Sequence, residues 1–309
     1  MITLEGLTKR YGESTAVDAL DLTISPGRVT GFLGPNGAGK STTMRMILGL
    51  DRPTAGSALV DGRPYAQWPV PLGKVGALLD AKALHPRRSA RNHLVAMARS
   101  NGIPVSRVDE VLRLVGVDEV GGKRAGAFSL GMGQRLGIAG ALLGDPEILM
   151  FDEPVNGLDP DGVRWVRQLM RSLAAEGRTV FVSSHLMSEM QLTADQLVVI
   201  GRGRLIADAP VAEVIAGSSR TTVHVRVPER AGLAVLRERL TAEAEQVESR
   251  ADQLVVAGVP AERVGDLAYE LGVRLHELTT VRASLEEAYM ELTADSVEYG
   301  VAADVSAVA

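Results

Sequence analysis

The chain has 309 residues, of which 46% are hydrophobic and 23% are charged, and its formal net charge is −5. These values are ordinary for a globular protein, and they exclude a mainly disordered chain and the strongly basic surface of a typical nucleic-acid-binding domain. Cysteine is absent, which excludes disulfides, thiolate zinc sites, iron–sulfur clusters and cysteine nucleophiles.

The sequence predicts neither a membrane span nor a secretory signal. The longest apolar run near the middle of the chain, 136–144, is far shorter than the roughly 18 residues that a transmembrane helix needs. The N-terminus carries Glu5 and has no long apolar stretch. We therefore expect the chain to stay in the cytosol, and any action at a membrane would need another polypeptide as an anchor.

The first two-thirds of the chain alternate short apolar runs with helical patterns, which predicts a parallel sheet covered on both faces. The expected strands are 28–33, 75–80, 147–152, 179–183 and 196–200, and the expected helices of the sheet domain are 41–50, 160–175 and 186–192. Between about 81 and 144 the pattern is mostly helical, with helices at 90–100, 106–115 and 134–143. We interpret this stretch as a helical subdomain inserted in the sheet domain.

A small polar stretch near residue 217 is a plausible linker to a second unit. After it the sequence predicts strands at 222–227, 246–250, 253–256 and 273–278 and helices at 233–240, 261–271 and 284–292. This β-α-β-β-α-β order suits a small α+β, ferredoxin-like domain. The predicted domains are therefore 1–215, with a sheet core and the helical subdomain, then 216–295, and then a flexible tail at 296–309.

Residues 34–41 read GPNGAGKS, a phosphate-binding loop motif, between a predicted strand and a predicted helix. Glycines let the loop turn its N–H groups toward phosphate oxygens, and the helix start adds the positive end of its dipole. Lys40 supplies a charge for the β- and γ-phosphates, Ser41 is placed for Mg²⁺, and Thr42 can reach the α-phosphate. The alternative is a flexible glycine turn without a ligand.

A second motif, which is acidic, is ILMFDE at 148–153, where four apolar residues precede two carboxylates. Asp152 and Glu153 are expected at the carboxyl edge of a buried strand, where ligands of open α/β sheets bind. Asp152 suits Mg²⁺, and Glu153 suits a general base for the attacking water. Alone, the pair could be an ordinary acidic strand exit, and with the loop it would also suit a GTPase, a nucleotide kinase or a RecA-like motor.

Further motifs indicate which class of nucleotide-binding protein the chain resembles. FSLGMGQR at 128–135 resembles the signature sequence of ATP-binding cassette (ABC) ATPases, and NGLDP at 156–160 resembles their D-loop. His185 in SSHLMSE resembles the family's switch histidine, and Tyr11 in KRYG lies where the family places an aromatic residue that stacks on adenine. These motifs occur in the family's order across 1–215, and the guanine-reading N-K-x-D motif of GTPases is absent. The resemblance implies the P-loop NTPase (RecA-like) fold.

The resemblance also implies roles for individual residues. Glu153 and His185 would be catalytic, and Ser129 and Gly131 would face the γ-phosphate of an ATP held by a partner copy. The implied nucleotide-binding residues are Tyr11, Gly34, Pro35, Asn36, Gly37, Ala38, Gly39, Lys40, Ser41, Thr42, Ser129 and Gly131. The implied Mg²⁺ ligands are Ser41, Asp80 and Asp152.

Plainer interpretations stay open for several of these residues. Ser129 could be a simple helix N-cap. Asp159 of the D-loop, which the resemblance implies links the two copies' sites, could be the N-cap of the helix that begins at Pro160. Tyr11 could be an ordinary surface tyrosine, and His185 an ordinary histidine at a strand end.

Two positions depart from the family pattern. The family usually has a glutamine at the end of the strand 75–80, where this chain has Asp80, which can accept but not donate a hydrogen bond when ionised. The signature segment has Leu130 and Met132 where glycine and glutamine are commoner. These departures could lower turnover, but Lys40 and the acidic pair remain, so we expect a competent ATPase.

VGALLDAKALHP, FSLGMGQRLGIA and ASLEEAYMELT resemble the ATP-binding subunits of bacterial daunorubicin- and bacitracin-type exporters, which confer antibiotic resistance. This resemblance implies a homodimer that binds two Mg·ATP, separate transmembrane permease subunits, no nucleic acid, and a place at the cytoplasmic face of the membrane. The basic residues Arg87, Arg88 and Arg91 are either a solvated face or part of the contact with the permease. An importer ATPase, a soluble ABC ATPase and a regulatory module that hydrolyses ATP poorly are the alternatives.

Overall fold

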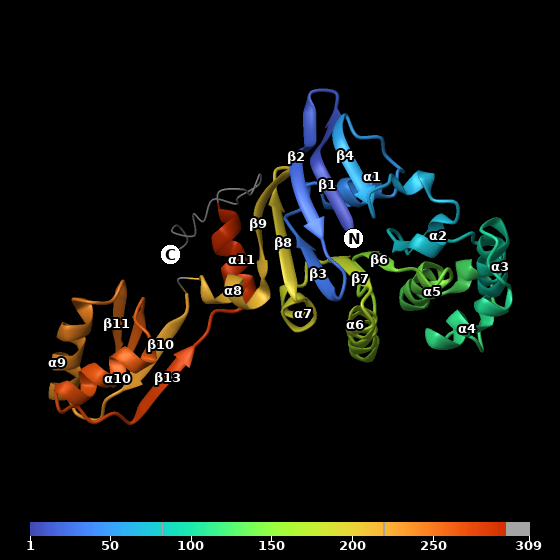
Figure 1. The fold of residues 1–309 in the computed structure, drawn as a ribbon. Helices are drawn as coiled ribbons and strands as arrows, with labels where there is room; N and C mark the ends of the chain where they lie inside the picture. Colours follow the sequence, from blue (N-terminus) through green and yellow to red (C-terminus); the bar gives the residue numbers. More distant parts are fainter. Residues whose placement is uncertain (82, 219, 295–309) are drawn as a thin grey trace, which may run out of the picture. The chain divides into compact units, whose positions relative to one another are not determined.

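A computed structural model describes residues 1–81, 83–218 and 220–294 of the chain (Figure 1). The described chain divides into two compact units, Met1–Ala209 and Pro210–Ala294, whereas the sequence placed the boundary between residues 215 and 216. The predicted tail at 296–309 lies outside the described residues. The first unit contains two sheets and the second contains one, and each unit has its own hydrophobic core.

The first unit begins with a three-stranded antiparallel sheet in the order β2-β1-β4. Its strands are β1 (Ile2–Tyr11), β2 (Ser14–Ile24) and β4 (Ala55–Val60). Near the end of β2, Leu20, Leu22 and Ile24 are buried while the residues between them are exposed, the period-2 pattern of a sheet covered on one face. The sequence analysis predicted none of these strands.

The main sheet of the first unit has six strands in the order β5-β6-β7-β3-β8-β9. Its strands are β3 (Arg28–Leu33), β5 (Val75–Leu78), β6 (Ile148–Asp152), β7 (Thr179–Ser183), β8 (Gln196–Gly201) and β9 (Arg204–Pro210). The pairs from β5 to β8 are parallel, which confirms the predicted α/β class. The sequence predicted β3 and β7 with the observed bounds and missed β9.

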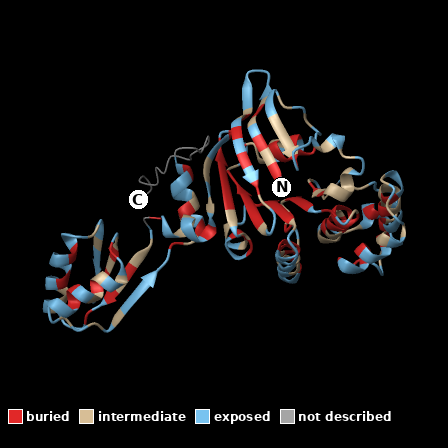
Figure 2. Ribbon diagram, in the orientation of Figure 1, coloured by how far each residue is buried: buried red, intermediate tan, exposed pale blue. Residues whose placement is uncertain are grey.

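The parallel strands are buried along nearly their whole length, as their continuous apolar runs require (Figure 2). One hydrophobic core joins the antiparallel sheet, α1 (Lys40–Ile47) and one face of the main sheet. Within it the rings of Phe32 and Phe181 have centroids 4.9 Å apart. The helix α6 (Pro160–Ala175) contacts β3 and β7, and α7 (Met187–Thr193) packs beside α6.

A short helix, α2 (Pro71–Lys74), precedes β5, and the inserted stretch after β5 contains three longer helices. These are α3 (Ala90–Ser100), α4 (Ser106–Leu114) and α5 (Leu130–Leu142). The prediction that the last of them starts at 134 is wrong, because the helix begins four residues earlier, at Leu130. The Ser129 side chain caps it there by accepting a hydrogen bond from the Met132 N–H at 3.3 Å. The signature segment therefore forms the first turn of α5, which packs against β5.

The second unit has a four-stranded antiparallel sheet in the order β11-β12-β10-β13. Its elements are α8 (Val211–Ala216), β10 (Thr222–Arg226), α9 (Arg230–Thr241), β11 (Gln246–Arg250), β12 (Gln253–Ala257), α10 (Ala261–Glu270), β13 (Glu277–Val281) and α11 (Leu285–Thr293). Chain order and sheet order together are those of the predicted ferredoxin-like sandwich. Side chains of α9 and α10 fill its core against β10 and β12.

The last strand of this sheet differs from the prediction of a strand at 273–278. Val273 and Leu275 pack against the core from the connection that precedes the strand, and β13 pairs with β10 only from Glu277 onward. An apolar pattern signals burial, and here the apolar residues, which are partly buried, lie in a loop. The strand itself is mostly exposed, so its own residues gave no such signal.

Candidate functional site

The glycine-rich loop connects β3 to α1 at the carboxyl end of β3, as its motif predicts. Gly37 has a φ of +83°, and Gly39, the N-cap of α1, has a φ of +102°. Both values lie in a region that residues with a Cβ atom rarely adopt. The Ala38 N–H also donates to the Pro35 carbonyl at 3.1 Å, which tightens the loop. The loop can therefore wrap closely around an anion at the start of α1.

Gly39→Ala is expected to lower both stability and nucleotide affinity. A Cβ atom at this position would lie 2.4 Å from the backbone oxygen of Ala16, so the loop must shift, and the backbone strain alone costs about 1–3 kcal/mol. Gly37→Ala is the matched control, because it also has a positive φ but no atom lies within 4 Å of its added Cβ. Thermal unfolding and nucleotide titration should therefore show a larger loss for Gly39→Ala. Equal losses in the two variants would contradict this view of the loop.

Lys40 lies at the first position of α1 and reaches back over the loop. Its Nζ donates to the carbonyl oxygens of Gly34 at 2.6 Å and Pro35 at 3.1 Å. Desolvation by burial lowers the pKa of Lys40, while the nearby Glu153 and Asp152 carboxylates act in the opposite direction. A half-buried ammonium group with only carbonyl partners gains from an additional anion. This arrangement favours phosphate oxygens at the mouth of the loop.

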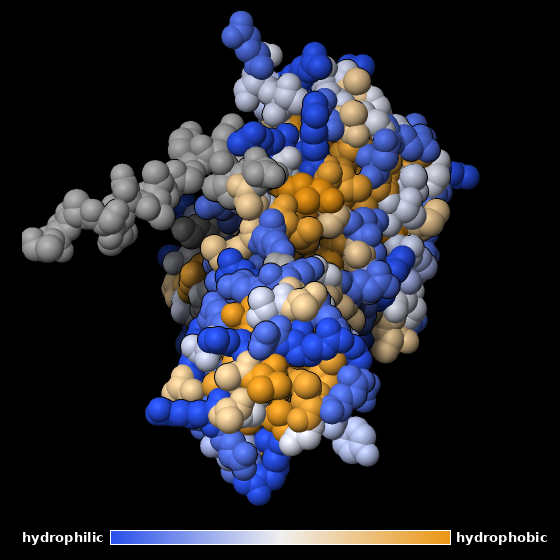
Figure 3. Space-filling view, turned by 90° about the vertical axis from the view of Figure 1, so that its left-hand side faces the viewer, coloured by the Kyte–Doolittle hydropathy of each residue, from blue (hydrophilic) through white to orange (hydrophobic). Residues whose placement is uncertain are grey.

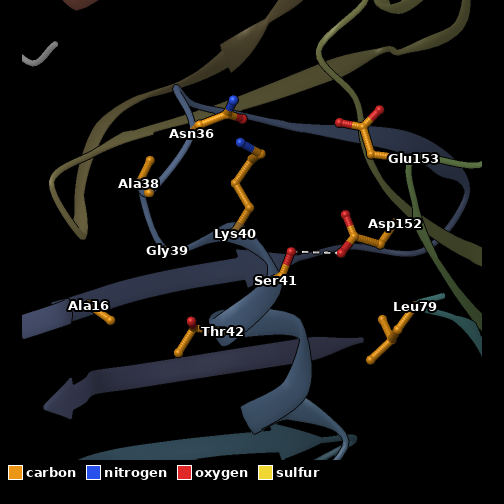
Figure 4. A pocket seen from close by; sticks show the side chains of 11 residues that line it. Ala16, Asn36, Ala38, Gly39, Lys40, Ser41, Thr42, Leu79, Asp152 and Glu153 are labelled. Atoms are coloured by element: carbon orange, nitrogen blue, oxygen red, sulfur yellow. Dashed lines mark hydrogen bonds between the residues drawn. The ribbon is translucent and has the colours of Figure 1, made fainter. Parts of the chain in front are cut away.

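A cavity of about 490 Å³ opens at this loop (Figure 4). Its lining residues are Ala16, Asn36, Gly37, Ala38, Gly39, Lys40, Ser41, Thr42, Leu79, Asp152 and Glu153. It thus brings together loop residues and the acidic pair, which are more than 100 positions apart in the sequence. In Figure 4 the side chains of Lys40, Ser41 and the acidic pair surround the same space.

Asp152 ends β6 and is fixed from two sides. One carboxylate oxygen accepts a hydrogen bond from the Ser41 hydroxyl at 2.8 Å, and the other accepts one from the Ser183 hydroxyl at the end of β7. A hydroxyl and a carboxylate oxygen at hydrogen-bond distance are hard oxygen donors of the kind that Mg²⁺ prefers. Magnesium sites of this type usually take their remaining ligands from waters and substrate phosphates, so two protein ligands fit the ion.

Glu153 follows directly, with its side chain about one quarter exposed. Its carboxylate lies 2.8 Å from the Nδ1 atom of His185, so the structure brings the two residues that the resemblance implied to be catalytic into contact. Glu153 also has a φ of +52°, a left-handed conformation that is uncommon outside glycine. The Gln134 amide donates to its main-chain carbonyl at 2.8 Å. A carboxylate held in this way can accept a proton from a water in the cavity.

Tyr11 lies at the end of β1 and is half exposed. Its hydroxyl donates to Asp51 at 3.3 Å, and Arg45 of α1 donates to the same carboxylate at 2.7 Å. The Lys9 ammonium lies 4.9 Å from the centre of the Tyr11 ring. The ring does not line the cavity of the loop. An accessible aromatic face held near the phosphate helix is compatible with base stacking.

The signature segment also lies outside the cavity. Ser129 and Leu130 instead line a second cavity of about 490 Å³ among mostly apolar residues of the helical subdomain. Gly131 is closely packed, since an added Cβ would lie 3.2 Å from the Gly157 carbonyl oxygen. Within one chain the structure does not bring Ser129 and Gly131 into the phosphate cavity. Their predicted contact thus requires a nucleotide held by another copy.

Asp159 and Asp80 do not line the phosphate cavity. The Asp159 side chain caps α6 by accepting a hydrogen bond from the Gly162 N–H at 2.8 Å, which is the plainer of its two interpretations. Asp80 is exposed just beyond β5 and does not line the cavity, whereas Leu79 does. Its predicted role as a magnesium ligand remains a prediction.

The sequence analysis missed the residues that support the acidic pair. Ser183 and Gln134 are both buried, and neither belongs to a motif that carries chemistry by itself. Ser183 had a weak signal, since it ends the strand that neighbours β6. Gln134 also had a weak sequence signal, since a glutamine inside a buried apolar helix needs a hydrogen-bond partner.

Family models match two parts of the chain. The model described as ABC transporter matches residues 17–156, and the model described as Domain of unknown function (DUF8746) matches residues 221–286. The first match covers the phosphate loop, the signature segment and the acidic pair. The second covers most of the ferredoxin-like unit.

Curated relatives are similar over much or all of the chain. "Uncharacterized ABC transporter ATP-binding protein YhcH" of Bacillus subtilis is 36% identical, covering 96% of this chain and 97% of the relative. "Bacitracin transport ATP-binding protein BcrA" of Bacillus licheniformis is 42% identical, covering 68% and 70%. "Daunorubicin resistance ATP-binding protein DrrA3" of Streptomyces coeruleorubidus is 33% identical, covering 95% and 96%.

A solved structure shares the fold of the first unit. "Dimeric Structure of MJ0796, a Bacterial ABC Transporter Cassette" is 25% identical with a TM-score of 0.63, covering 68% of this chain and 98% of that one. The predicted P-loop NTPase core is thereby confirmed.

Proposed function

Because this chain belongs to the ATP-binding subunits of ABC transporters, we propose that its phosphate cavity binds Mg·ATP and hydrolyses it to power a membrane exporter. The observation that carries the proposal is the convergence of Lys40, Ser41, Asp152 and Glu153 on one cavity. The predicted family and the ATPase activity that it implies are confirmed by these relatives. The residue roles below are proposals.

The loop at 34–41 would hold the phosphates of ATP. Its N–H groups and the start of α1 would face the phosphate oxygens, and the Lys40 ammonium would leave its carbonyl partners for the β- and γ-phosphates. Thr42 lines the same cavity near the start of α1 and would reach the α-phosphate. Tyr11 would stack on the adenine, held by its hydrogen bond to Asp51.

Ser41 and Asp152 would hold the magnesium ion, with Asp80 as a further proposed ligand. When bound, the ion neutralises charge on the β- and γ-phosphates. The Ser41 hydroxyl and the Asp152 carboxylate lie 2.8 Å apart, and Ser183 keeps the carboxylate oriented from its other oxygen.

Glu153 would act as the general base of hydrolysis. Its carboxylate accepts a proton from the attacking water as the water's oxygen bonds to the γ-phosphorus and the bond to the β–γ bridging oxygen breaks. His185 contacts this carboxylate through Nδ1, which would be the donor because an ionised carboxylate can only accept, and the contact would orient the base. A further hydrogen bond from Nε2 to the γ-phosphate would require both ring nitrogens to carry a hydrogen. The products are ADP and phosphate.

Two copies of the chain would share each ATP. Ser129 lies at the N-terminus of α5 outside its own chain's cavity, so it would cap the γ-phosphate of an ATP held by the partner. Such a contact exists only while the γ-phosphate is attached. ATP binding would then favour the dimer in which both copies contact the nucleotide, and hydrolysis would remove the contact that stabilises this dimer.

The transport partner would be a permease on a separate chain, and the place of action the cytoplasmic face of the membrane. No helix within the described part of the chain is both long and apolar enough to cross a bilayer. The second cavity, lined by Leu84, Pro86 and Phe128 among others, offers an apolar groove beside Arg87 and Arg88 for a permease segment. The second unit also exposes the side chains of Val235, Tyr269 and Met290. Figure 3 shows hydrophobic patches bordered by hydrophilic surface, a pattern that is typical of interaction surfaces.

Antibiotics or similar drugs are the proposed cargo. The chain's similarity to a bacitracin transport subunit and a daunorubicin resistance subunit supports this class. The test is to express the chain together with those neighbouring open reading frames, if present, that encode hydrophobic spans. Solubilised membranes should yield the chain together with a permease, and drug efflux should depend on Glu153. Recovery of the chain only from the cytosol under these conditions would contradict the exporter.

A further inference from the structure

The main chain at Glu153 is held in an unfavourable conformation by several neighbours. Its φ of +52° is rare for a residue with a side chain and persists only where the surroundings fix it. Its N–H donates to the carbonyl oxygen and the hydroxyl of Ser183, both at 3.2 Å. Its carbonyl oxygen accepts from the Asn156 N–H at 3.3 Å and from the Gln134 side chain at 2.8 Å.

The contact from Gln134 differs in origin from the others. Ser183 belongs to β7 and Asn156 to the turn after Glu153, whereas Gln134 belongs to α5 of the helical subdomain. Gln134 is 3% exposed, so its amide is shielded from water and its hydrogen bond cannot be replaced cheaply. The placement of the base thus depends directly on the position of α5.

The same helix carries the signature segment at its N-terminus. Ser129 caps α5, and Gln134 follows five positions later, about 7–8 Å along the helix axis at 1.5 Å per residue. Because a helical segment of this length moves as a unit, a shift at Ser129 displaces the Gln134 amide as well. A left-handed residue such as Glu153 responds to the loss of one restraint by relaxing.

We propose that Gln134 is a positioning residue that couples capping of the partner-held ATP at Ser129 to the placement of Glu153 in the chain's own site. This inference rests on the proposed function, and it adds a route by which one ATP site controls hydrolysis at the other. Capping sets α5 in its place, Gln134 then holds the Glu153 carbonyl, and the base points into the cavity.

The test compares Gln134→Met and Gln134→Leu with the wild type in ATPase assays over a range of ATP concentrations. Both side chains are close to glutamine in size, and neither can donate a hydrogen bond. We expect kcat to fall about 10- to 100-fold, because small misplacement of a catalytic group costs that much, with KM little changed. The Hill coefficient should fall from above 1 in the wild type toward 1.

A matched control separates positioning from lost stability. Ile138→Val also alters a buried residue of α5, but its side chain has no hydrogen-bonding group. It should lower Tm while leaving the Hill coefficient unchanged. If Gln134→Met does not fold, Gln134→Leu gives the same comparison, since its side chain also lacks a hydrogen-bond donor.

The outcomes are distinguishable. A wild type without ATPase activity would overturn the proposed function and this inference with it. A wild type that hydrolyses ATP with a Hill coefficient of 1 would overturn the coupling alone. Gln134 variants that keep the wild-type kcat and Hill coefficient would also overturn the coupling and leave the proposed function standing.

Discussion

Glu153→Gln should lower kcat for ATP hydrolysis by about 10²- to 10⁴-fold, the usual contribution of a general base. The amide has nearly the same shape as the carboxylate but cannot accept the proton of the attacking water. The loop and Lys40 are untouched, so the affinity for ATP should change little. Phosphate release under saturating Mg·ATP, together with a nucleotide titration, measures both quantities.

Glu147→Gln is a suitable control for this prediction. Glu147 lies just before the same strand β6, and it is largely exposed in a surface pair with Lys74. Surface pairs contribute little to stability, so this variant should keep its ATPase activity. If Glu153→Gln hydrolyses ATP at the wild-type rate, Glu153 is not the base. Equal and negligible rates in both the wild type and the variant would instead favour a regulatory nucleotide-binding module.

Lys40→Ala should weaken ATP binding by about 10²- to 10³-fold, by analogy with removing one preorganised donor from an anion site. Lys40 is the one basic residue among the described residues that line the cavity, and the Asp152 and Glu153 carboxylates face the same cavity (Figure 4). Without Lys40, these two negative charges would repel the phosphates. Isothermal titration with ATP and with ADP measures the loss.

The loss should be greater for ATP than for ADP, because Lys40 is proposed to reach the γ-phosphate as well as the β-phosphate. Lys123→Ala removes an exposed lysine of the helical subdomain and serves as the charge control. Its ATP affinity should match that of the wild type. An unchanged affinity in Lys40→Ala, with the fold intact, would remove the loop from the binding site.

The sequence predicted the parts of the fold where burial and local signals agree. The strands β3 and β7 are buried at nearly every position, so continuous apolar runs mark them clearly. The helix α6 begins at Pro160 behind the Asp159 cap, and its predicted bounds hold. The phosphate loop was predictable because its chemistry requires a fixed spacing of glycine, lysine and serine.

The remaining parts depend on contacts between distant residues. The strands β1 and β2 pair through irregular registers with bulges, which interrupts the alternation that would mark them. Gln134 and Ser183 act on the acidic pair from 19 and 31 positions away, so no local motif reveals them. Asp80, which the family resemblance suggested as a ligand, does not line the cavity whereas Leu79 does, and its role as a magnesium ligand stays a prediction.

The most direct test of the shared nucleotide is the mass of the Glu153→Gln chain in solution, measured by light scattering with and without Mg·ATP. A nucleotide held by one copy's loop and capped by the other copy's Ser129 predicts twice the mass of one chain only when Mg·ATP is present. Adding Ser129→Glu should abolish this change, since a carboxylate repels the γ-phosphate, while ATP still binds. A Glu153→Gln chain that binds ATP and keeps one mass in both conditions would contradict the shared site.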